Sequence, residues 1–158
     1  IPLYHVKAND AWYHPGMFGE FMRAHAPNML YQEMNTPPEE EDLERFRERV
    51  AQVDTVVFFN VFWRGSGSNR PLIRECVKMG KKVVVVSNDA YDSYFLPTAG
   101  TLLITFGPMP QGTRVAADVI FGKARPEGQW QFKAVGLEDL APEDEEVDHF
   151  VAGHFAER

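Results

Sequence analysis

Three nearly continuous apolar runs dominate the hydrophobic pattern of the chain. They cover residues 55–63 (TVVFFNVFW), 82–87 (KVVVVS) and 101–106 (TLLITF), and they are rich in β-branched and aromatic residues. Strands that are covered on both faces have this composition, which is typical of a parallel sheet between layers of helices. Weaker strand patterns occur at residues 3–7 and 29–34, and residues 130–133 (WQFK) predict a last, edge strand.

Helical spacing of apolar residues fills the intervals between these strands. The first helix carries the stripe Met17, Phe18, Phe21 and Met22, and similar stripes recur further along the chain. The pattern predicts helices over residues 10–26, 36–53, 71–79, 91–96 and 112–121.

Local signals predict where several of these helices begin and end. Thr36, Pro37 and Glu39 match a capping box with proline at the first helical position, which predicts that the second helix starts there. Gly80 and Gly122 follow the last apolar residues of two later helices, where a glycine commonly terminates the helix.

The alternation of strands and helices predicts the fold class. We expect an α/β three-layer sandwich with a mostly parallel, flavodoxin-like open sheet of about five or six strands flanked by helices. Residues 1–136 would form this single domain, and residues 137–158 an acidic amphipathic helix or tail. The tail carries an apolar stripe that would dock on its own domain or on a partner: Val147, Phe150, Val151 and Phe155.

Composition narrows the classes of partner. The chain has 158 residues, a formal net charge of −7 and 25% charged residues, so we expect no binding to the phosphate backbone of nucleic acids. No apolar run reaches the length needed to cross a membrane, and we expect no membrane partner. The one cysteine, Cys76, lies on a helical apolar stripe and is interpreted as a small core residue.

The loop of residues 64–71 (RGSGSNRP) joins a predicted buried strand to a predicted helix, where phosphate-binding loops occur. The dinucleotide pattern G-x-G-x-x-G fails because Arg70 stands at its last position, and no phosphate loop of the form G-x-x-x-x-G-K-[ST] is present. A turn capped by Ser68 or Asn69 is the favoured interpretation, flavin or nucleotide binding is the alternative, and no cofactor is predicted.

Metal-binding and nucleophilic motifs are weak. His149 and His154 are five residues apart, which places them on different faces of a helix, and no metal site is predicted from them. The acidic run at residues 39–42 is interpreted as a solvated helix face that complements the helix dipole, with a metal site as the remote alternative. No G-x-S-x-G nucleophile elbow occurs.

Residues 53–132 resemble the C-terminal α/β domain of family 3 glycoside hydrolases, in particular the β-N-acetylglucosaminidase branch. The most specific stretch is ADVIFGKARPEG at residues 117–128, which is similar to the family pattern of a helix A-x-V-L-F-G followed by P-x-G. The turn at residues 87–92 and the G-P-x-P at residues 107–110 are also similar to that branch. Trp130 and Gln131 depart from the Leu-Pro that the family has near this point.

This resemblance implies that the catalytic nucleophile lies elsewhere, because the family carries it on a barrel domain that these residues do not contain. Neither Glu75, within a predicted helix, nor Glu127, in a closing turn, matches the acid/base glutamate of the family, so no catalytic residue is predicted. The implied partners are a catalytic barrel domain or subunit, a carbohydrate and a second copy of the chain.

The first functional hypothesis is therefore the non-barrel domain of a family 3-like hydrolase of N-acetylglucosaminides. Its substrate-binding residues would stand at the carboxyl ends of strands, where aromatic rings stack on sugars and polar groups bond hydroxyls: Trp63, Arg64, Asn88, Asp89 and Tyr91. The alternative is a non-catalytic flavodoxin-like module that binds a small ligand or a protein partner, or that self-associates.

Overall fold

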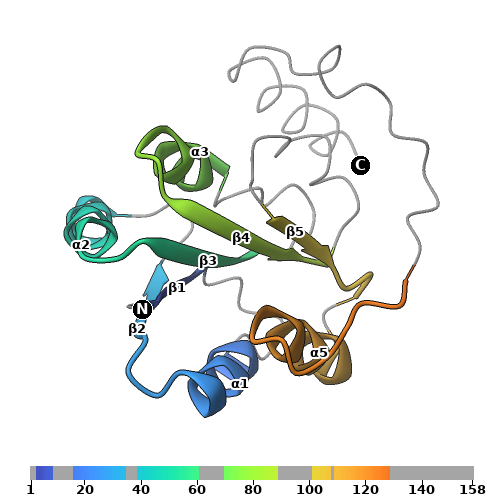
Figure 1. Cartoon of the computed structure of the whole chain (residues 1–158). Coiled ribbons are helices and arrows are strands. Elements are labelled where there is room, and N and C mark those ends of the chain that lie inside the picture. Colours follow the sequence, from blue (N-terminus) through green and yellow to red (C-terminus); the bar gives the residue numbers. More distant parts are fainter. Residues whose placement is uncertain are drawn as a thin grey trace, which may run out of the picture.

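The alternating pattern folds into an α/β domain (Figure 1). The computed structural model of the chain describes residues 3–8, 16–34, 39–60, 70–88, 101–107 and 109–128. Its strands are β1 (Leu3–Ala8), β2 (Leu30–Met34), β3 (Thr55–Asn60), β4 (Lys82–Ser87) and β5 (Thr101–Ile104). Its helices are α1 (Gly16–His25), α2 (Glu40–Ala51), α3 (Arg70–Lys78) and α5 (Pro110–Ile120).

The strands form one sheet in the order β2-β1-β3-β4-β5, and every neighbouring pair is parallel. This is the strand order of flavodoxin-like doubly wound sheets. The predicted α/β fold with a parallel sheet is therefore confirmed. The order also fixes a switch point between β1 and β3, where successive connections leave the sheet in opposite directions.

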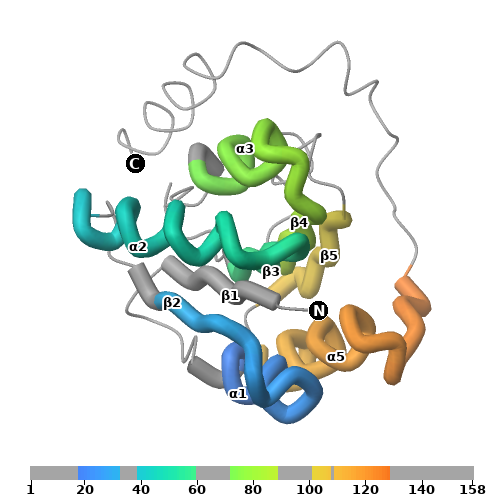
Figure 2. The backbone as a smooth tube through the Cα atoms, turned by 60° about the vertical axis from the view of Figure 1, so that its left-hand side comes forward, coloured from blue at the N-terminus to red at the C-terminus, as the bar shows by residue number. Residues whose placement is uncertain are grey.

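Helices cover both faces of the sheet, α2 and α3 on one and α1 and α5 on the other (Figure 2). The continuous apolar pattern of β3 follows from this, because alternate residues face opposite layers. Phe58 faces the α2 side, where its ring centroid is 6.3 Å from that of Phe46. Phe59 faces the α1 side and stacks on Phe18 at a centroid distance of 4.8 Å.

Cys76 is a core residue, as predicted, and it is fully buried in the cluster between α2, α3 and the sheet. Burial raises the pKa of its thiol to about 12, the neighbouring Glu75 carboxylate adds to the rise and Lys81 opposes it. The predicted helix stops are also confirmed, since Gly80 has φ 73° and Gly122 has φ 68°. A left-handed backbone at these positions costs glycine nothing in steric terms.

The predicted capping box of α2 is wrong. Glu39 is the N-cap and has an extended backbone, with φ −80° and ψ 160°, so it is not the third residue of a helix that starts at Pro37. A second proline disfavours the helical conformation of the residue before it, which delays the start of the helix. The first turn is filled instead by Glu40, Glu41 and Asp42, which face the positive end of the helix dipole.

Two apolar predictions change at the edge of the sheet. The strand predicted over residues 101–106 ends at Ile104, and it is only partly buried because it is the last strand in the order that the described residues form. On α5 the spacing in the sequence predicts an inward stripe of Val115, Ala116, Val119 and Ile120. In the structure Ala116 and Ala117 are buried against the sheet, whereas Val115 is 50% exposed.

Several predictions fall outside the described residues. These are the helix at 91–96, the strand at 130–133, the boundary at residue 136 and the acidic tail at 137–158. In the part of the chain that is described, no helix combines the length and apolarity that a membrane span requires.

Candidate functional site

The carboxyl ends of the parallel strands meet along one edge of the sheet, which is where ligands bind in folds of this kind. The switch point lies between β1 and β3 on this edge. The connections that leave these two strands are residues 9–15 and 61–69, both outside the described residues. Trp63 and Arg64, two of the predicted substrate-binding residues, belong to the second connection and keep the status of predictions.

The tips of β3 and β4 are adjacent. Asn60 at the end of β3 is paired in register with Ser87 at the end of β4. Asn88 follows directly and is half-buried. The topology therefore brings Asn60, Ser87 and Asn88 to the same edge, whereas Asp89 and Tyr91, like Trp63 and Arg64, lie outside the described residues and stay predictions.

Thr105 joins the tips of β4 and β5. Its backbone N–H donates to the carbonyl oxygen of Ser87 at 2.8 Å, which continues the strand pairing one residue beyond β5. Its hydroxyl donates to the carbonyl oxygen of Gly107 at 2.7 Å and lies 3.2 Å from that of Ser87. Ser87 is itself fully buried, so this cluster orders the backbone that leads into α5.

The turn that Thr105 orders contains a strained residue. Phe106 has φ 54°, a left-handed conformation that is rare for a bulky side chain, and its side chain is 66% exposed. Met109, three residues later, is 63% exposed. An exposed aromatic ring on a strained backbone at a strand tip marks this turn as a candidate contact surface.

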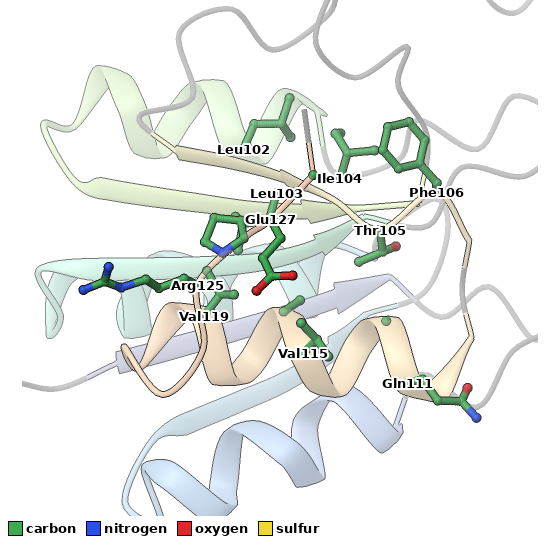
Figure 3. A pocket seen from close by; sticks show the side chains of 14 residues that line it. Leu102, Leu103, Ile104, Thr105, Phe106, Gln111, Val115, Val119, Arg125 and Glu127 are labelled. Atoms are coloured by element: carbon green, nitrogen blue, oxygen red, sulfur yellow. The ribbon is translucent and has the colours of Figure 1, made fainter. Parts of the chain in front are cut away.

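A pocket of about 870 Å³ lies beside this turn, between β5, α5 and residues 125–128 (Figure 3). Leu102 and Ile104 lie on one side of β5, and Thr105 and Val115 lie on the other, so the pocket wraps the edge of the sheet. Sequence reasoning missed this pocket. Its walls come from three separate segments, and the nearest sequence signal is the G-P-x-P at residues 107–110.

The two glutamates considered as acid/base candidates, Glu75 and Glu127, lie in separate segments, and the acidic run at the start of α2 forms ion pairs. Glu75 lies in α3, 3.7 Å from Arg47, and Glu127 is exposed beside the pocket on the α5 side of the sheet. The acidic run at the start of α2 pairs with arginines, with Glu41 2.6 Å from Arg45. No cluster of three metal-ligating side chains occurs among the described residues.

The fold of this chain was compared with those of known proteins. No family model and no curated protein matches the chain. A solved structure that it resembles is a glycoside hydrolase family 3 beta-N-acetylglucosaminidase from Paenibacillus sp. str. FPU-7, with a TM-score of 0.70 and 20% sequence identity. The chain shares its fold with part of that enzyme. The match covers 81% of this chain and 26% of the enzyme's chain, so the sequence spans about a quarter of its length.

The predicted resemblance to family 3 glycoside hydrolases is thus confirmed at the level of the fold. The residues that carried it are consistent with the structure, since Ala117, Val119 and Ile120 lie in α5 and Gly122 terminates that helix. Pro126 and Gly128 then lead the chain along the pocket beside β5.

Proposed function

We propose that this chain is the non-barrel α/β module of a family 3-like glycoside hydrolase that acts on N-acetylglucosaminides. The observation that carries the proposal is the fold match, which covers most of this chain and only a minor part of an enzyme of that description. The module packs against a catalytic barrel domain or subunit and contributes loop residues to the sugar site. The barrel supplies the nucleophile.

The distribution of carboxylates supports a role without autonomous catalysis. Retaining hydrolysis places two carboxyl groups about 5–5.5 Å apart around the bond that is cleaved. Glu75 projects from α3 on one face of the sheet, whereas Glu127 follows α5 on the other. These two described glutamates therefore do not flank a common substrate position.

The sugar-binding role rests on the carboxyl edge of the sheet. Trp63 and Tyr91 are proposed to stack on the apolar face of a sugar ring, and Arg64 to bond hydroxyls or an acidic substituent. Asn88 follows the tip of β4, beside the tip of β3, and Asp89 is the next residue in the sequence. Support for this arrangement is the parallel register of β3 and β4, which ends both strands at the same level.

A panel of nitrophenyl glycosides combined with thermal unfolding tests the proposal. The isolated chain is expected to release no nitrophenol from the N-acetylglucosaminide, and N-acetylglucosamine oligomers are expected to raise its Tm because they bind the folded state. Turnover by the isolated chain would contradict the division of labour with a barrel. A Tm that no oligomer changes would contradict the sugar-binding role.

The strand order favours a second candidate, a flavodoxin-like module that binds a small ligand or a protein partner, or that self-associates. Flavin mononucleotide in the same thermal experiment distinguishes it, because a Tm increase with flavin and none with sugar would favour this candidate.

For self-association, molar mass is measured with and without residues 137–158. If the chain is a dimer and deletion of residues 137–158 makes it a monomer, the dimer contact lies in the tail.

A further inference from the structure

We propose that the aromatic ring of Phe106 is a platform on which a sugar ring of the substrate stacks, an inference that rests on the proposed function and adds a binding residue to it. Phe106 lies two residues beyond Ile104, the last residue of β5. The sequence pattern placed it within a buried strand over residues 101–106 and gave no indication of this role. Its backbone conformation, its exposure and its position in the fold indicate the role instead.

The backbone of Phe106 has a conformation that suits glycine. Its φ is 54°, and among the non-glycine residues that the structure describes it is the one with φ in the left-handed region. A Cβ atom crowds the following carbonyl oxygen in this region, so the conformation has a cost for phenylalanine that glycine would avoid. Strain of this kind concentrates at ligand-binding and active sites.

The ring of Phe106 does not offset this cost by packing in the core. It is 66% exposed, whereas the fully buried phenylalanines of the core are at most 3% exposed: Phe18, Phe46, Phe58 and Phe59. An exposed ring gains hydrophobic stabilisation only when a ligand or partner covers it. The side chain at this position is therefore better explained by binding than by folding.

Hydrogen bonds on both sides of Phe106 hold its backbone in place. The N–H of Thr105 donates to the carbonyl oxygen of Ser87 at 2.8 Å, which ties the turn to the tip of β4. The Thr105 hydroxyl donates to the carbonyl oxygen of Gly107 at 2.7 Å, and this bond spans Phe106. The ring is therefore carried on an ordered backbone, so less conformational entropy is lost when a ligand binds to it.

Phe106 belongs to the edge of the sheet where the sugar is proposed to bind. Ile104 is paired in register with Ser87 at the end of β4, and the parallel strands β3, β4 and β5 end at this edge. Figure 3 shows the Phe106 ring past Ile104, at the end of β5. Asn88 directly follows Ser87, and a side-chain amide bonds sugar hydroxyls and acetamido groups. The tips of neighbouring strands thus carry an exposed aromatic ring and an amide.

The chemistry of this edge favours a neutral sugar as the ligand. One face of a pyranose ring is lined by C–H groups, which an aromatic ring removes from water while the hydroxyl groups stay accessible around it. A nucleotide base also stacks on aromatic rings, but the formal net charge of −7 disfavours its phosphates. An N-acetylglucosamine unit carries no charge and avoids this repulsion.

Isothermal titration calorimetry of the chain with the N-acetylglucosamine trimer tests the proposal. Phe106→Gly is expected to raise the Kd about tenfold or more, because the stacked ring is lost. Its Tm should equal or exceed that of the wild type, because glycine adopts φ 54° without strain. Phe106→Trp retains an aromatic face and should keep the Kd within about threefold of the wild-type value. A ring that served stability alone would show the reverse, a lower Tm for Phe106→Gly with an unchanged Kd, and this result would overturn the proposal.

Met79→Ala is the matched control. Met79 is 46% exposed and precedes the amino end of β4, so its substitution removes exposed apolar surface away from the carboxyl edge and should leave the Kd unchanged. Equal Kd values for Phe106→Gly and this control would overturn the proposal and leave the proposed function standing, as would equal losses of affinity in Phe106→Gly and Phe106→Trp. A wild type that binds no trimer would overturn both. A doubled molar mass of the wild type that Phe106→Gly halves would assign the ring to a contact between copies and would also overturn the proposal.

Discussion

Nε2 of His25, at the end of α1, lies 2.7 Å from Oδ1 of Asp118 in α5. The imidazole ring also stacks on Phe121, with ring centroids 4.9 Å apart. The two partners are 93 positions apart in the sequence, and their side chains are 22% and 29% exposed. This contact therefore joins two helices on the same face of the sheet, in a setting where water screens the pair only partly.

Asp118→Asn is expected to lower the free energy of unfolding by about 1 kcal/mol, because a partly buried hydrogen bond to a charged group is weakened. Urea denaturation measures this, and the double variant with His25→Gln measures the coupling between the two side chains. The control is Glu41→Gln, which removes the exposed pair with Arg45 and should cost about 0.5 kcal/mol or less. A loss for Asp118→Asn no larger than that of the control would contradict the role of the pair.

Gly122 and Gly128 both have room for a side chain, but only Gly122 has a left-handed backbone. Substituting each of them therefore distinguishes the effect of backbone conformation from that of packing. A Cβ atom at Gly122 or at Gly128 would meet no heavy atom within 4 Å, and Gly122 has φ 68°. Gly122→Ala is expected to lower stability by about 1 kcal/mol through backbone strain alone. Gly128→Ala is expected to change it by less than about 0.5 kcal/mol. Equal effects in thermal or urea unfolding would contradict the explanation of how α5 ends.

The Cys76 thiol is expected to resist alkylation by iodoacetamide in the folded protein at neutral pH. The thiolate is the reactive form, and burial raises the pKa of this thiol to about 12. Mass spectrometry of the alkylated protein, with and without urea, makes the comparison. Rapid labelling of the native chain would contradict the burial of Cys76.

The same thiol makes stability depend on alkaline pH. The unfolded chain, with the ordinary pKa of 9.0, loses this proton before the folded chain does, whose pKa is about 12. The contribution of the Cys76 thiol to the free energy of unfolding is therefore fully present below pH 9, and it declines as pH rises toward 12. Cys76→Ala removes it, so the wild type should lose more stability than the variant across this interval. Parallel pH profiles would contradict the assignment.

The buried strands could be predicted from the sequence because their signal is local. Val83, Val85 and Val86 lie in a strand that is covered by helices on both faces, and its bounds match the predicted 82–87. The helix ends at Gly80 and Gly122 could also be predicted, because the left-handed backbone that ends a helix depends on the residue at that one position.

The edge of the sheet could not be predicted in the same way. The pattern TLLITF resembles a buried strand, and its place as the last strand depends on pairing order, which periodicity does not encode. On α5, the packing against α1 and the sheet selects Ala116 and Ala117 as the inward residues and leaves Val115 half exposed. The pocket beside β5 was missed for the same reason, since no single segment of the sequence contains all of its lining residues.

The adjacency of the ends of β3 and β4 could be predicted from the sequence, whereas the substrate-binding site assigned to them stays a prediction. Parallel strands place the segments after β3 and β4 at one edge, and the sequence alone indicated that edge. The roles of Trp63, Arg64, Asp89 and Tyr91 depend on side-chain positions outside the described residues, so they stay predictions.

A titration of the isotope-labelled chain with N-acetylglucosamine, followed by amide NMR, tests the proposed sugar-binding module most directly. The account predicts saturable shift changes at Asn60, Ser87 and Asn88, at the carboxyl ends of β3 and β4, while the amide signals of Leu102 and Ile104 stay in place. Shift changes confined to Leu102 and Ile104, or none at saturating sugar, would contradict it.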